Sequence, residues 1–138
     1  MSIKQEIFNK VYAAVVAQAA PAVNGTGNSA VCTYRGVNNT KCAIGHILSD
    51  EQIEKYGVMS STLLPQNFPI ELVNELVPGV KSEDAVMFMR RLQRVHDDAA
   101  FYKFNQVTVG EDFVNAYKRG MRVLAADMGL TVPSEDSV

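Results

Sequence analysis

The sequence predicts an α+β fold, a mostly helical single domain with one small β-hairpin after the first helix. Two observations favour helices: apolar residues recur at helical spacing in several segments, and capping signals precede some of these segments. A third observation favours the hairpin, because residues 30–45 place β-type residues on either side of a Gly-Val-Asn-Asn sequence that is typical of a turn.

The first helix is expected at residues 2–20. Ile3, Ile7, Val11 and Val15 recur at four-residue steps and form one apolar face. Pro21 follows and ends the helix, because proline disrupts the helical hydrogen-bond ladder. The next residues are rich in Gly, Asn and Ser, which is typical of a loop.

The predicted hairpin has strands at residues 30–35 and 40–45, joined by a turn that contains Gly36. Alternation along the first strand places Cys32 on one face and Arg35 on the other. An isolated hairpin is only marginally stable, so we expect this one to pack on helices or to pair with another chain.

Four helices are expected after the hairpin. Ser49 opens S-D-E-Q, a capping box for a helix at residues 50–56 that ends at Gly57. Pro69 suits the first position of the next helix, which Pro78 ends.

The two remaining helices have serine or threonine at their predicted starts. Ser82 is expected to cap a helix that reaches about Asp98. Thr108 and Glu111 form a second capping box, and this last helix ends before Gly129.

Composition indicates one globular domain at residues 1–132 and a flexible acidic tail at residues 133–138. The chain has 138 residues, 47% of them apolar, and carries 13 basic against 15 acidic side chains. This balance argues against nucleic acid and anionic membranes as partners. We find no export signal or membrane span and expect two free thiols in a cytoplasmic protein.

Three kinds of site can be built from the polar residues. Cys32, Cys42, His46 and His96 are ligands that zinc accepts, although the spacing of the cysteines is not that of a zinc knuckle. A cysteine nucleophile could use His96 and Asp97, but adjacent residues of a helix normally point apart. The alternative for these residues is buried, structural side chains.

The third kind of site is an anion or nucleotide pocket. Arg35 lies next to Tyr34, and one predicted helix carries Arg90, Arg91 and Arg94. Arginine binds phosphate through paired N–H groups, and aromatic rings stack on bases. A solvated helix flank and an internal ion pair of Arg35 are the alternatives that the sequence leaves open.

Three segments resemble a group of small uncharacterised proteins of phages and bacteria. They are CTYRG at residues 32–36, KCAIGHILSDE at residues 41–51 and LQRVHDD at residues 92–98. The group's motifs are C-x-Y-R-G, K-C-A-[VI]-G-x-x-[IL]-x-D-E and L-Q-x-x-H-D. The chain departs from the group at Ser49, where Pro is common, and in lacking an acidic, glycine-containing segment after Tyr56.

The resemblance implies no reaction, but it implies that the hairpin and the Leu-Gln-x-x-His-Asp helix act together. Gln93, His96 and Asp97 would then face the Arg35 region, either as a polar network that locks the fold or as a site.

The leading prediction is a non-enzymatic binder of a small anionic, nucleotide-like ligand, and no cofactor is expected. The predicted ligand-binding residues are Tyr34, Arg35, His46, Arg90, Arg94, His96 and Asp97. By analogy with other phage proteins, it would be a homo-oligomer in the host cytoplasm that sequesters a defence signal. The alternatives are an inhibitor that binds a host protein and a zinc- or thiol-dependent enzyme.

Overall fold

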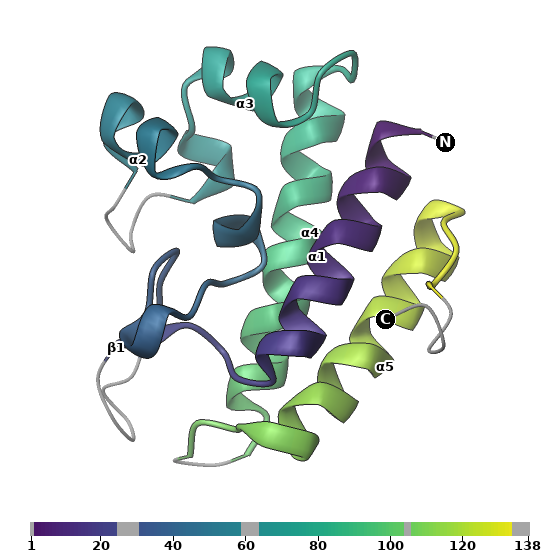
Figure 1. Ribbon diagram of the computed structural model, residues 1–138. Helices are drawn as coiled ribbons and strands as arrows, with labels where there is room; N and C mark the ends of the chain where they lie inside the picture. Colours follow the sequence, from purple (N-terminus) through teal and green to yellow (C-terminus); the bar gives the residue numbers. More distant parts are fainter. Residues whose placement is uncertain (1, 25–30, 59–63, 104–105, 134–138) are drawn as a thin grey trace.

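Three long helices form the main body of the protein in the computed structural model, which describes residues 2–24, 31–58, 64–103 and 106–133 (Figure 1). They are α1 (Ile3–Gln18), α4 (Ser82–Phe101) and α5 (Gly110–Met128), and α5 contacts both of the others. The shorter helices α2 (Asp50–Tyr56) and α3 (Ile70–Leu76) lie near one end of α4 (Figure 1).

Buried aromatic side chains join the long helices. Tyr12 of α1 and Tyr117 of α5 have ring centroids 6.3 Å apart, and Phe113 stacks on Tyr117 at 6.1 Å. All three rings are almost fully buried, as is Phe8 one turn before Tyr12. Burial of each large apolar side chain contributes about 1.5–3 kcal/mol, so this row of rings is a principal source of stability.

The predicted α+β class is wrong, because the described part of the chain is mostly helical and residues 31–35 do not pair with residues 40–45 as strands. The only β-pairing among the described residues joins β1 (Val23–Asn24) to β2 (Val31–Cys32), two residues on each side. Such a ladder is too short to form a sheet layer.

The predicted turn is present, although the two predicted strands do not pair around it. Asn38 and Asn39 both have positive φ, at 58° and 61°, and the Gly36 N–H donates to the Thr40 carbonyl at 2.8 Å. After Thr40 the chain does not extend; it bends into a 3₁₀ turn, η3 (Ile44–His46). The backbone groups that a second strand would pair are bound by helix side chains instead.

Helix termini agree only in part with the predicted capping signals. Both hydrogen bonds of the Ser49 capping box are present, and Gly57 and Gly129 are left-handed C-caps, as predicted. Ser82 does not cap α4, because Lys81 occupies the N-cap position without a side-chain bond. Thr108 does not cap α5, since Val109 precedes the first helical residue.

Within the described ranges, none of the helices combines the length and the apolar character needed to cross a lipid bilayer. Of the predicted acidic tail, only Pro133 falls within those ranges, and residue 30 of the predicted hairpin lies outside them.

Ser49→Ala should lower the free energy of unfolding by about 1 kcal/mol, because it removes the hydroxyl that accepts the Gln52 N–H at 3.0 Å. Ser82→Ala is the matched control and should change it by less than about 0.5 kcal/mol, because Ser82 caps nothing. Urea denaturation of both variants measures the difference. Equal losses would contradict the assignment of the caps.

Candidate functional site

Arg35 is bound on all sides by its own loop. Nη1 donates to the carbonyls of Tyr34 at 3.0 Å and Gly45 at 2.8 Å, and Nη2 donates to the Leu48 carbonyl at 2.8 Å. Nε and Nη2 both donate to Asp50 Oδ1 at 3.1 Å. A guanidinium has five N–H groups, so every donor of Arg35 is used and none is left for an anion.

The loop around this guanidinium is closely packed. A Cβ added to Gly45 would collide with the Tyr34 carbonyl oxygen and lie 3.2 Å from Arg35 Nη1, so only glycine fits there. The Tyr34 ring is buried and packs against Phe68, with ring centroids 5.9 Å apart. Burial raises the pKa of Tyr34, so its hydroxyl stays neutral. We call residues 34–50 the Arg35 loop.

A second polar network surrounds Asp97. Its Oδ1 accepts the Gln93 side-chain amide at 2.8 Å and lies 3.0 Å from His96 Nδ1. Cys32 also hydrogen-bonds to Asp97. Gln93 Oε1 in turn accepts the Ile44 N–H at 3.1 Å. The expectation that Asp97 points away from His96 is therefore wrong.

The tautomer of His96 follows from its other nitrogen. Nε2 accepts the Ala22 N–H at 3.2 Å, so Nε2 carries no proton and Nδ1 of the neutral ring must carry one. His96 therefore donates to Asp97. The imidazole is fully buried, and its edge meets Phe113 at 5.8 Å between ring centroids.

Cys32, His96 and Asp97 offer ligand atoms within 4.8 Å of one another, the arrangement that a metal ion would need. A metal bound at Nδ1 would move the histidine proton to Nε2, which would then face the Ala22 N–H donor. Metal-bound histidines normally use that second nitrogen as a donor to an oxygen. The geometry of this cluster is therefore a poor fit to zinc.

The thiols are poor candidates for nucleophiles. Burial, together with the Asp97 carboxylate, raises the pKa of Cys32 far above its usual range. Burial raises the pKa of Cys42 to about 12. Reactive cysteines need neighbours that stabilise the thiolate, and the Asp97 charge does the opposite at Cys32.

Gln18, which is not among the predicted site residues, anchors the Arg35 loop to α1. Its Oε1 accepts the Lys41 N–H at 2.9 Å, and its Nε2 donates to the Lys41 carbonyl at 3.0 Å. Two helices thus bind backbone groups of residues 22–44, α1 through Gln18 and α4 through Gln93 and His96. Nothing in the local sequence around Gln18 signals this role.

His46 lies in the same loop and has a buried Nε2 without a hydrogen-bond partner. Burial lowers the pKa of His46 to about 4, and the positive charges of Lys41 and Arg35 contribute further. This imidazole is neutral at pH 7 and attracts no anion.

The arginines of α4 lie in a different part of the molecule and border two adjoining hollows. The first, the Met87 hollow, has a volume of about 390 Å³ and is lined by Met87, Arg90, Arg91 and Arg94. The second, the Tyr102 hollow, has a volume of about 430 Å³ and lies between α4 and α5. Its lining includes Arg91, Arg94 and Arg119, with Tyr102. We call the two hollows together the arginine groove.

Charge in the arginine groove is only partly compensated. Arg91 pairs with Asp127 at 2.8 Å, and Arg94 approaches Asp98 at 3.5 Å with most of its side chain exposed. Arg90 and Arg119 are exposed and have no acidic partner within the described ranges. The groove is therefore a positively charged surface with free guanidinium donors.

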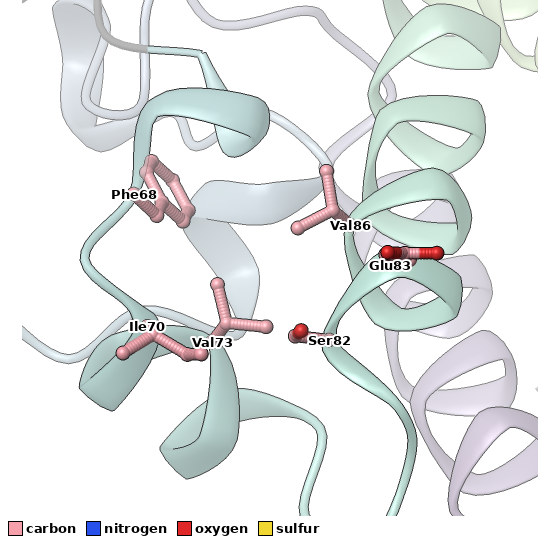
Figure 2. Close-up of a pocket in the computed structure, with 6 residues that line it drawn as sticks. All are labelled: Phe68, Ile70, Val73, Ser82, Glu83 and Val86. Atoms are coloured by element: carbon pink, nitrogen blue, oxygen red, sulfur yellow. The ribbon is translucent and has the colours of Figure 1, made fainter.

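A third hollow of about 380 Å³ lies where α3 and the preceding turn meet the start of α4. Figure 2 shows Phe68, Ile70 and Val73 on one side and Val86, Ser82 and Glu83 on the other. It is mostly apolar, its one charged lining residue is an acid, and it therefore does not suit an anion.

The predicted site residues thus separate into three groups. Arg90 and Arg94 meet in the arginine groove. Tyr34, Arg35 and His46 belong to the Arg35 loop, and His96 and Asp97 to the Asp97 network. Gln93 links the Asp97 network to the Arg35 loop, because it binds both Asp97 and the Ile44 N–H. Among the described residues, Arg35 and Asp97 themselves share no hydrogen-bond partner. Arg119 and Tyr102 were not predicted.

Arg35→Lys should lower the free energy of unfolding by about 1–3 kcal/mol, because an ammonium has three N–H groups and leaves a loop carbonyl without a donor. Arg122→Lys is the control, since Arg122 is exposed and should tolerate the change within about 0.5 kcal/mol. Urea denaturation measures both, and equal stability of Arg35→Lys and the wild type would contradict the structural role of Arg35.

Stability should fall as the pH drops from about 6.5 to about 4, in part because of His46. Its folded-state pKa of about 4 lies below that of the unfolded chain, about 6.5, so the unfolded state binds the proton first. His46→Gln should make the loss of stability over this window smaller. Denaturation at pH 7, 5.5 and 4.5 tests this, and identical slopes for the two proteins would refute it.

The chain matches no family model, no curated protein and no solved structure.

Proposed function

We propose that the protein is a non-enzymatic binder of a small anionic, nucleotide-like ligand, and that the ligand binds in the arginine groove. The observation that supports this most directly is the convergence of Arg91 and Arg94 of α4 with Arg119 of α5 on one hollow. Helix packing holds these side chains together, since Val95 Cγ1 would lie only 2.7 Å from a Cβ at Gly120.

The ligand phosphate would bind to the guanidinium groups, which form paired, charge-assisted hydrogen bonds with phosphate oxygens. Arg90 and Arg119 have donors free for this contact, and within the described ranges Arg91 donates to Asp127 through Nη2 alone, so its other N–H groups are available. Arg94 can exchange its weak contact with Asp98 for a better one. The ring of the ligand would lie on the apolar inner wall of the Tyr102 hollow, beside Tyr102.

The rest of the prediction is retained as part of this proposal. A phage protein that sequesters a signal nucleotide in the host cytoplasm would need a binding groove and no catalytic group. A homo-oligomer would enclose the groove further. The proposed site leaves out the predicted residues whose polar groups are buried or bound within the fold. They are Tyr34, Arg35, His46, His96 and Asp97.

A second candidate function, an inhibitor that binds a host protein, is favoured by the rim of the groove. Met87 and Val123 are each 60% exposed, and Tyr102 is 49% exposed. Methionine, tyrosine and arginine are enriched at protein interfaces. This function would be favoured if no nucleotide bound the wild type and if a host protein that co-purifies with the wild type were lost in Met87→Ser and Val123→Ser.

Nucleoside monophosphates and triphosphates should bind the wild type in isothermal titration calorimetry, and the corresponding nucleosides should bind more weakly. Arg94→Ala and Arg119→Ala should each raise Kd about tenfold, the effect of losing one charged hydrogen bond. Arg122→Ala is the matched control, because Arg122 is exposed on α5 and lines neither hollow.

Affinity should also fall with added salt, because the contacts are exposed charges. The proposal would be wrong if no nucleotide bound, or if Arg122→Ala weakened binding as much as Arg94→Ala.

A further inference from the structure

The two hollows of the arginine groove share a wall. Arg91 and Arg94 line both of them, whereas Met87 and Arg90 border only the first and Arg119 only the second. A phosphate that binds the shared pair would therefore have an open hollow on each side.

The Tyr102 hollow has a lining that suits a flat ring. Apart from Arg91, its less exposed members are small or β-branched residues, namely Val95, Ala99, Ala116 and Gly120. No side chain at position 120 can fill the space toward α4, because Val95 occupies it. Tyr102 adds an aromatic face, and Asp98 adds an acceptor for base N–H groups.

The Met87 hollow offers a different but compatible surface. Met87 is exposed and adaptable, and the planar Arg90 guanidinium beside it can stack on a ring. The α4 residues that line the two hollows are centred near residues 90 and 96, so the hollows are about 9 Å apart along α4 at 1.5 Å per residue. With volumes of about 390 and 430 Å³, each hollow is near the lower end of the range for small-molecule sites.

We propose that the groove binds two nucleosides joined through phosphate, with the phosphate on Arg91 and Arg94 and one base in each hollow. This inference rests on the proposed function and names its ligand class. A mononucleotide would fill one hollow and leave the other open. Two sources share this chemistry: a free dinucleotide, linear or cyclic, and a dinucleotide step of a single strand.

The test is isothermal titration calorimetry with one base type in four forms: the mononucleotide, the linear dinucleotide, the cyclic dinucleotide and a single strand of eight nucleotides. At least one dinucleotide should bind about tenfold or more tightly than the mononucleotide, since a second base adds its own contacts. If the protein binds the eight-nucleotide strand no more tightly than the dinucleotide, the ligand is a free dinucleotide. If it binds the eight-nucleotide strand much more tightly, the ligand is a single strand. Both outcomes support the inference.

Variants locate the two bases. Met87→Ala and Tyr102→Ala remove one side chain from each hollow, and both should weaken dinucleotide binding several-fold. Mononucleotide binding should be weakened by only one of them. Arg122→Ala should leave both ligands unaffected.

Equal affinities for the mononucleotide and every dinucleotide would overturn this inference and leave the proposed function intact. Absence of binding by all four forms would overturn both. Circular dichroism of each variant checks that a lost affinity is not a lost fold.

Discussion

The arrangement of the irregular segment depends on the guanidinium of Arg35. Its five N–H groups bind three carbonyls and one carboxylate oxygen of the Arg35 loop, including those of Gly45 and Asp50. An irregular loop has no ladder to pair its backbone carbonyls, and burying them without a donor would cost about 1–3 kcal/mol each. One side chain supplies these donors, and glycine at position 45 leaves room for it.

The loop is then attached to the helices by amides and an imidazole. Gln18, Gln93 and His96 each bind a backbone group of the segment between Ala22 and Ile44. In this setting His96 accepts a backbone N–H, and the half-buried Cys32 and the buried Cys42 are protonated thiols. The conspicuous residues of the sequence therefore hold the fold together, and the ligand that we propose would bind instead to the exposed arginines of α4 and α5.

Helices were predictable here because their signals are local. The periodic apolar residues of α1 and the capping box at Ser49 need only a few neighbouring residues to be read. The hairpin was wrongly predicted because its residues are β-formers whose partners come from elsewhere. Gln18 and Gln93 bind the backbone of Lys41 and Ile44, and local patterns carry no information on such long-range bonds.

The candidate site was predictable only on its α4 side. Arg90 and Arg94 share a helix with one another, but Arg119 reaches them through the packing of α5 on α4. Gly120, in the middle of a helix, is the signal that could have indicated this close contact, because glycine there costs helix stability and leaves space for a neighbouring helix. The resemblance to the phage and bacterial group remains a prediction. Arg35 and His96, which belong to the group's motifs, both make hydrogen bonds that stabilise the fold.

The central claim is that the fold uses every donor of Arg35, whereas the arginine groove keeps free donors. It can be measured directly by NMR of arginine side-chain N–H signals during a pyrophosphate titration. The Arg35 Nε–H signal should exchange slowly with solvent and keep its position throughout. The signals of the groove arginines Arg90, Arg91, Arg94 and Arg119 should shift together and saturate. A saturating shift of Arg35, with the groove arginines unmoved, would contradict the account.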